Sequence, residues 1–481
     1  MAAIGTFWAS GGLAPATLWG QVVAPPVVVT SPTDPAAASS WGDPYQIPTT
    51  PPLAPAGGLF NGPIFGAPAA TTSTGPTALN APMMAAPIQG DGRLLPIFDG
   101  GPLSNTFTSY PPLLPRVSEH IDSRLYFRGE YLLWDVSGMD SPSLVTTSPG
   151  GTPQATAGVL GETGTSTRFG NTELNDGSAS GFLLGSGFWI SPERRFGVET
   201  EYFWLEDMND GFSASSDGSP ILARPFFDIV AGQQTAQLLA YPGLVSGNVR
   251  VGTESSLRSF LINGRFALCQ SPVVPCQPCE MQDRTDWILG YRNLRLRDSL
   301  AVSENLQSEL ETAPGSVSLS DSFETTNQFQ GLQLGVVRRT VRNQIWLESS
   351  IRVALGNNEQ TLRTDGSTSY TESGVTDVLP GGLLVQRTNS GTFRKDEFVM
   401  IPELGLRLGL RLTTRLHASI GYTVLYFPNV IRASEQIDTD VNPGLIPDEL
   451  DPLEGALRPR TLWVQSDYLA HGLTIGGEFR F

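Results

Sequence analysis

The chain ends in Gly472-Leu-Thr-Ile-Gly-Gly-Glu-Phe-Arg-Phe481, a stretch in which side chains alternate in character. One parity carries apolar side chains, and the other carries polar or charged ones. The apolar set is Leu473, Ile475 and Phe479, and the polar set is Thr474, Glu478 and Arg480. Because successive side chains of a β-strand point to opposite faces of a sheet, this spacing predicts a strand with one apolar face.

The same alternation recurs from Arg124 onward, and ten segments fit the pattern of half-buried strands. In the clearest of them, Leu404, Leu406, Leu408 and Leu410 share one parity. The opposite parity holds Glu403, Arg407 and Arg411. The ten predicted strands are residues 124–134, 178–190, 195–206, 254–268, 284–300, 320–337, 343–363, 395–412, 415–427 and 468–481.

Charged residues make up 16% of the 481-residue chain, whereas soluble proteins average about a quarter. No continuous apolar run has the length of about 18 residues that a membrane helix needs. A barrel with lipid-facing side chains on every second position and a polar inward face would account for both observations.

The links between the predicted strands alternate in length. Short links lie at residues 191–194, 338–342 and 413–414, and long, Gly-, Ser-, Thr-, Asn- and Asp-rich loops are expected at 207–253, 364–394 and 428–467. Short turns at one end and long loops at the other are typical of membrane barrels. The predicted fold is therefore all-β, a transmembrane antiparallel up-and-down β-barrel of about ten strands, with twelve as the alternative.

Residues 1–120 differ in composition from the predicted barrel at 121–481. This segment holds about half of the chain's 38 prolines, and it is rich in Ala and Gly. Such a composition buries too little apolar surface to offset the entropy of ordering, so we expect a mostly disordered arm. Its first residues match a secretory signal poorly, since no basic residue precedes the apolar run, which indicates an atypical or truncated signal.

Three cysteines, Cys269, Cys276 and Cys279, lie close together. The spacing of Cys276 and Cys279 allows a disulfide, and free thiols are the other simple interpretation. A metal site would need a fourth ligand and a redox motif would need a strand-to-helix context, and the sequence offers neither. We therefore predict no cofactor and no metal. The net charge of -17 argues against nucleic-acid binding.

Four segments of the predicted strands resemble the putative beta-barrel porin family seven, a group of bacterial outer-membrane proteins. These segments are Arg124–Trp134, Ile401–Gly409, Gly421–Tyr426 and Gly472–Phe481. The resemblance covers roughly residues 120 to 481. It implies a barrel in the outer membrane of a Gram-negative type bacterium, and it brings no catalytic residues.

The expected partners follow from this location. Phe479 and the terminal Phe481 fit the C-terminal assembly signal of outer-membrane barrels, which predicts contact with the barrel-assembly machinery. The outward apolar parity predicts contact with outer-membrane lipid. With an even number of strands, the start of the first strand and the end of the last strand lie on the same side of the membrane. The arm is therefore expected in the periplasm. The oligomeric state stays open.

The inward parity of the predicted strands carries both signs of charge. Ten strands enclose a narrow interior, because eight leave room only for packed side chains and about sixteen are needed for a wide channel. Opposite charges on neighbouring strands could pair into a plug. Alternatively, they could line a narrow pore and set its ion selectivity. The predicted lumen residues are Arg128, Glu130, Glu199, Glu201, Glu348, Arg352, Glu403, Arg407, Arg411 and Glu478.

The sequence thus predicts a porin with a narrow charged lumen. A non-conducting structural or adhesive surface barrel is the main alternative. A surface enzyme on a barrel scaffold is a remote one, because His120, His417 and His471 lack an obvious acid-base partner in the sequence. We expect no enzymatic activity.

Overall fold

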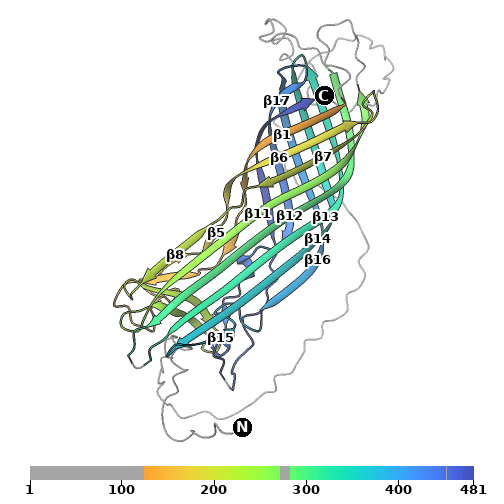
Figure 1. Cartoon of the computed structure of the whole chain (residues 1–481). Helices are drawn as coiled ribbons and strands as arrows, with labels where there is room; N and C mark the ends of the chain where they lie inside the picture. The colour runs from red at the N-terminus through yellow and green to blue at the C-terminus, as the bar shows by residue number, and fades with distance from the viewer. Residues whose placement is uncertain (1–123, 271–281, 312, 451) are drawn as a thin grey trace, which may run out of the picture. The chain divides into compact units, whose positions relative to one another are not determined.

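A closed antiparallel β-barrel of ten strands dominates the computed structural model (Figure 1). The structure describes residues 124–270, 282–311, 313–450 and 452–481. The barrel strands, in chain order, are β1 (Leu125–Val136), β6 (Gly177–Trp189), β7 (Phe196–Leu205), β11 (Val245–Gln270), β12 (Gln282–Ser308), β13 (Ser316–Arg342), β14 (Ile345–Glu372), β16 (Gly391–Arg411), β17 (Leu416–Val430) and β19 (Ser466–Arg480).

Each barrel strand pairs with the next barrel strand along the chain, and the pairing of the last strand with the first closes the circle. β19 pairs with β1, with Phe479 opposite Phe127, and β11 pairs with both β7 and β12. The all-β class and the ten-strand barrel are confirmed, and the alternative of twelve barrel strands is wrong. Twelve is the size of the whole sheet, in which β8 (Gly211–Ser216) and β15 (Val375–Pro380) extend the barrel strands β11 and β14.

The outward face of the barrel carries a continuous belt of exposed apolar side chains, here called the apolar belt. On β16, Leu404, Leu406 and Leu408 are each about half exposed, at 50%, 53% and 49%. Similar side chains face outward on each of the remaining barrel strands. They include Tyr131, Phe182, Tyr202, Phe260, Trp287, Leu332, Ile351, Ile420 and Ile475. The alternation seen in the sequence therefore separates an apolar exterior from the barrel interior.

The apolar belt ends at a sharp boundary on the long strands. Tyr291 of β12 and Leu332 of β13 are register partners in the last apolar row. In the next row Asn293 and Gln330 are partners, and Asn357 of β14 lies opposite Gln330. Beyond this row β11–β14 continue well past the belt with polar outward side chains. Short links at 190–195, 343–344 and 412–415 lie at the opposite end, here called the short-turn end, together with Leu125 and Arg480.

The long strands support a second layer beyond the apolar belt. A five-stranded sheet consists of β10 (Gln233–Ala240), β9 (Ile221–Asp228), β3 (Val145–Ser148), β4 (Ser166–Phe169) and β18 (Asp440–Val441). Its inward side chains share an apolar core with the extensions of β11–β13, including Phe226, Leu238, Val302 and Phe323. We call this two-layered region, visible at the lower left of Figure 1, the head.

The connections at this end contain further short elements. These are β2 (Met139–Ser141), β5 (Thr172–Leu174), η1 (Ser434–Gln436) and η2 (Pro443–Leu445). The prediction of loops at 207–253, 364–394 and 428–467 is wrong in part. The strands β8, β9, β10, β15 and β18 and the first residues of β11 fall within them. The helices of the described residues are short, and none could cross a membrane.

Candidate functional site: the charged layer of the barrel interior

Charged side chains on the inward parity meet in the barrel interior near the short-turn end. Among the ten residues predicted to line the lumen, Glu348 and Arg407 are partly exposed and the others are buried. They come from strands β1, β7, β14, β16 and β19. Alternation alone brings them together, because every second side chain of each strand points inward. We call this set, with the inward Arg265, Asp286 and Arg292, the charged layer.

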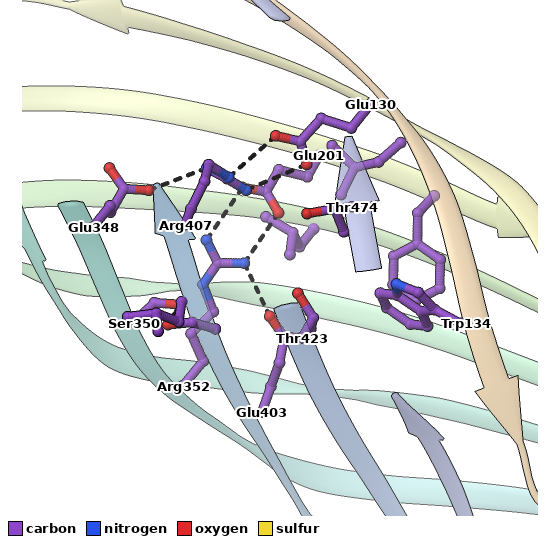
Figure 2. A pocket seen from close by; sticks show the side chains of 15 residues that line it. Glu130, Trp134, Glu201, Glu348, Ser350, Arg352, Glu403, Arg407, Thr423 and Thr474 are labelled. Carbon is purple, nitrogen blue, oxygen red and sulfur yellow. Dashed lines mark hydrogen bonds and ion pairs between the residues drawn. The ribbon is translucent and has the colours of Figure 1, made fainter. Parts of the chain in front are cut away.

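Arg352 of β14 is the central member of the charged layer (Figure 2). Its Nη1 lies 3.0 Å from Glu201 Oε2 and 3.1 Å from Glu403 Oε1. Glu403 in turn accepts a 2.6 Å hydrogen bond from Arg292 Nη1 on β12. Glu201 belongs to β7, which is separated from β14 by β11, β12 and β13 around the wall. The contact from Arg352 to Glu201 therefore crosses the interior of the barrel.

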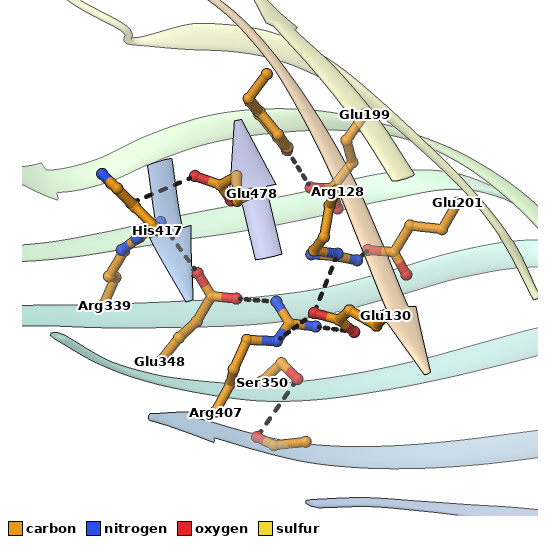
Figure 3. Close-up of polar contacts among 12 residues, drawn as sticks. Arg128, Glu130, Glu199, Glu201, Arg339, Glu348, Ser350, Arg407, His417 and Glu478 are labelled. Carbon is orange, nitrogen blue, oxygen red and sulfur yellow. Dashed lines mark hydrogen bonds and ion pairs between the residues drawn. The ribbon is translucent and has the colours of Figure 1, made fainter. Parts of the chain in front are cut away.

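A second branch of ion pairs joins β16 to β1 (Figure 3). Arg407 Nε lies 3.1 Å from Glu130 Oε1, and its Nη1 lies 3.1 Å from Glu348 Oε1. Arg128 Nη2 lies 2.6 Å from Glu201 Oε1, so Glu201 links the two branches. Burial makes an unpaired charge costly by several kcal/mol, which explains why these carboxylates and guanidinium groups are arranged as bridged pairs.

The charged layer continues toward the short-turn end through predicted residues and through others that the sequence interpretation missed. Arg265 of β11 lies 3.0 Å from Glu199 and 2.8 Å from Asp286 of β12. At the rim, Glu478 Oε1 lies 2.6 Å from Arg480 Nε and 3.8 Å from His417 Nδ1. Arg265, Asp286 and Arg292 were missed because the inward parity of β11 and β12 also carries leucines, which makes their two faces look alike in the sequence.

A cluster of apolar side chains, here called the apolar layer, lies in the barrel interior between the charged layer and the head, with the buried Ser259 and Asn358 in the same rows. Its members are buried and come from strands all around the wall. They include Leu132, Trp134, Phe203, Leu257, Leu294, Phe329, Ile401, Leu425 and Phe427. The polar inward face predicted from the sequence is therefore wrong at this level. Leu294 and Phe329 occupy the same inward parity as Arg292 on adjacent, paired strands.

Between the two layers lies a small cavity of about 30 Å³. Its lining includes Glu130, Trp134, Glu201, Arg352 and Arg407 (Figure 2). One water molecule needs roughly 10–15 Å³ of such space, so the cavity holds about two waters. A hydrated ion or an organic solute is larger than this space.

The remaining predicted positions lie apart from the charged layer. Phe479 and Phe481 face outward beside Phe127, and the Phe481 and Phe127 rings meet edge to face with centroids 5.7 Å apart. His471 also faces outward, where its Nδ1 lies 2.8 Å from the Tyr422 hydroxyl. Cys276, Cys279 and His120 lie outside the described residues, as does the arm at 1–120. Within the described ranges, no cluster of three or more His, Cys, Asp or Glu side chains could hold a metal ion.

Comparison with known families identifies the architecture. A family model described as putative beta barrel porin-7 matches residues 126–481, which is most of the chain. The chain belongs to this family. Membership confirms the resemblance seen in the sequence, and it identifies the protein as a β-barrel of the bacterial outer membrane. The apolar belt of this porin-7 family member has the side-chain composition of the lipid-facing surface of outer-membrane barrels.

Other comparisons add little beyond the barrel fold. The outer membrane protease OmpT from Escherichia coli has 7% identity and a TM-score of 0.34, with coverage of 75% of this chain and 97% of OmpT. The P. putida toluene transporter TodX has 8% identity and a TM-score of 0.19, with coverage of 76% of this chain and 93% of TodX. Similarities this weak carry no functional argument for the porin-7 family member. A search of curated proteins found no match.

Proposed function

We propose that this porin-7 family barrel is closed to solutes and acts as a structural or adhesive anchor that holds its head at the cell surface. The observation that carries the proposal is the position of Arg352, which bridges Glu201 and Glu403 across the interior. The apolar layer lies directly beside this bridge. Two layers of opposite chemistry thus block the same passage.

Opening the passage would be energetically costly in both layers. Breaking a buried ion pair by separating one partner costs about 3–5 kcal/mol unless water replaces the lost contact. Wetting the apolar layer would in addition forfeit burial worth about 1.5–3 kcal/mol for each large side chain. These costs favour the closed barrel in the absence of a specific trigger.

The proposal includes an orientation. The short-turn end, where the first and last barrel strands begin and end at Leu125 and Arg480, would face the periplasm, as short turns do in outer-membrane barrels, and the head would face the cell exterior. The arm at 1–120 would then lie in the periplasm. Phe479 and Phe481, exposed on the outward face beside β1, would be available to the barrel-assembly machinery before the barrel closes.

Conductance in planar lipid bilayers tests the closed barrel. We expect the refolded wild-type protein to insert without discrete current steps. A variant that thins both layers, Arg352→Ala with Phe329→Ala, should conduct and thereby show that inserted protein is detected. Arg363→Ala, an exposed change on the outward face of β14 in the head, is the matched control and should stay silent. Regular current steps from the wild type would overturn the proposal.

A narrow charged pore is the second candidate function. The cavity of about 30 Å³ supports it, because Glu130, Glu201 and Glu348 line this space with Arg352 and Arg407. A rearranged network could extend the cavity into a path for small ions whose selectivity the charges would set. If the wild type conducts, Arg407→Glu should shift the reversal potential in a salt gradient toward cation preference, whereas Arg363→Glu should leave it unchanged.

A further inference from the structure

Two arginines lie side by side on the outward face just beyond the apolar belt. Arg258 of β11 and Arg295 of β12 are direct register partners, and both are exposed. Neither forms an ion pair or side-chain hydrogen bond among the residues that the structure describes. Side chains at opposed positions of antiparallel strands have Cβ atoms about 4.5–5.5 Å apart, so two like charges there repel each other.

The position of this arginine pair relative to the membrane is fixed by its neighbours. Trp204 of β7 is the register partner of Arg258 on the other side, and Tyr202 is the partner of Phe260. Aromatic residues of this kind mark the interface between the hydrocarbon and the headgroups in outer-membrane barrels. Tyr291 belongs to the last apolar row of the belt, and Arg295 lies two rows beyond it on the same strand. The pair is therefore at the depth of the lipid headgroups.

No acidic side chain of the described residues forms an ion pair with Arg258 or Arg295. Glu324 lies 3.5 Å from Arg297, the next outward residue of β12, and is engaged there. Glu254 is on the same face as Arg258, two rows farther from the membrane, with Ser299 as its register partner. Two adjacent arginines without a bound carboxylate contrast with a chain whose net charge is -17. An anion between the two guanidinium groups would turn their repulsion into attraction.

We propose that Arg258 and Arg295 form a binding site for the phosphate of an outer-leaflet glycolipid. The guanidinium group presents planar, paired donors that match phosphate oxygens, and charge-assisted hydrogen bonds of this type are strong. Clustered basic residues beside a membrane attract anionic headgroups. The site would hold one lipid beside strands β11 and β12. This role does not depend on whether the lumen conducts.

Native mass spectrometry of the folded protein in detergent micelles tests the site, with diphosphorylated lipid A as the probe. We expect the wild type to retain lipid A, and Arg258→Gln with Arg295→Gln to raise the apparent Kd by about tenfold, because two charge-assisted contacts are lost. Lipid A stripped of its phosphates should bind the wild type as weakly as the double variant binds intact lipid A. Heat-modifiable gel migration verifies that each variant is folded.

Arg250→Gln is the matched control, since Arg250 is exposed on the same strand and the same face but lies farther from the belt. Its lipid A affinity should equal that of the wild type. An equal loss in Arg250→Gln, or no loss in the double variant, would overturn the site. Displacement of lipid A by an equimolar amount of inorganic phosphate would also overturn it, because free phosphate would then be the ligand.

Discussion

The two halves of strands β11–β14 use the same alternation with opposite chemistry. Within the apolar belt, β12 presents Trp287 and Tyr291 outward and buries Asp286 and Arg292. Beyond the belt the same strand presents arginines and serines outward and buries leucine and valine. This difference is the one expected if lipid surrounds the first half and water surrounds the second.

The contrast extends to how buried charge is handled. The barrel interior gathers many ion pairs into one layer, whereas the described residues beyond the belt hold smaller, separate ionic contacts such as Arg432 with Asp298 and the cluster around Arg224. In the Arg224 cluster, which lies within the apolar core of the head, Arg224 Nη2 lies 2.8 Å from Asp321 Oδ2 and Arg224 Nη1 lies 3.6 Å from Glu304 Oε2. The barrel interior should therefore be sensitive to charge changes, and the head should be sensitive to changes of apolar volume.

The largest expected effect is on the barrel. Arg352→Ala removes one guanidinium and leaves two buried carboxylates, Glu201 and Glu403, with fewer partners. The free energy of unfolding should fall by about 5 kcal/mol, the upper end for a broken buried ion pair. Urea titration in micelles, followed by heat-modifiable migration, measures it. Arg363→Ala on the same strand in the head should change stability by less than about 0.5 kcal/mol; equal losses would erase the contrast.

A somewhat smaller and more local effect is expected in the head. Phe323→Ala empties a fully buried site in the apolar core, and such a change costs about 4 kcal/mol. Limited proteolysis should then cleave the head rapidly while the barrel keeps its heat-modifiable migration. Ser322→Ala, one residue away on the outward face, is the control. Loss of barrel migration in Phe323→Ala would mean that the two halves fold as one unit.

The barrel strands could be predicted from the sequence because lipid imposes a strong rule. On β16, Leu404, Leu406 and Leu408 face outward while Glu403 and Arg407 face inward, so hydropathy and alternation agree. The head was hidden for the opposite reason. Its outward serines, threonines and asparagines, as on β13 beyond Gln330, have the composition of loops, and only alternation with buried leucine and valine distinguishes them from loops.

The charged layer could be predicted in part. Inward parity identified Glu201, Arg352 and Glu403 as residues of the interior, yet not which of them meet. Arg352 and Glu201 are 151 residues apart in the sequence, and their contact depends on the width of the closed barrel rather than on strand neighbours. The apolar layer was missed because Leu294 and Phe329 look like lipid-facing residues until the parity of their strands is fixed by the wall.

Introducing the same side chain on the outward face of both halves sharpens the comparison. Leu406→Arg places a charge in the lipid-facing belt, where Leu406 is half exposed, and should destabilise the barrel by about 3 kcal/mol. Ser299→Arg places it on the outward face of the head and should change stability by less than about 0.5 kcal/mol. Unfolding in phospholipid vesicles measures both. Comparable losses would argue against water outside the head.

The smallest effect concerns pH and is confined to the head. Burial raises the pKa of Glu304 to about 7, against the opposing attraction of Arg224. Glu304 lies on β12 well beyond the apolar belt. Because the folded state holds a proton that the unfolded chain releases near pH 4.5, stability is highest below that pH and falls as pH rises to about 7. Between pH 5 and 8 the head should lose about 2 kcal/mol.

Glu304→Gln separates this effect from other titrations. Glutamine keeps the shape of the protonated acid and the contact with Gln237, whose Nε2 donates to Glu304 Oε1 at 2.8 Å. Proteolysis rates of the variant head should therefore vary little from pH 5 to 8, whereas the wild-type head should become more susceptible as the pH rises. Glu324→Gln, an exposed change on the outward face of β13, should retain the wild-type profile. If the wild-type head instead gains stability from pH 5 to 8, Glu304 is ionised in the fold and its ion pair with Arg224 outweighs the cost of burial.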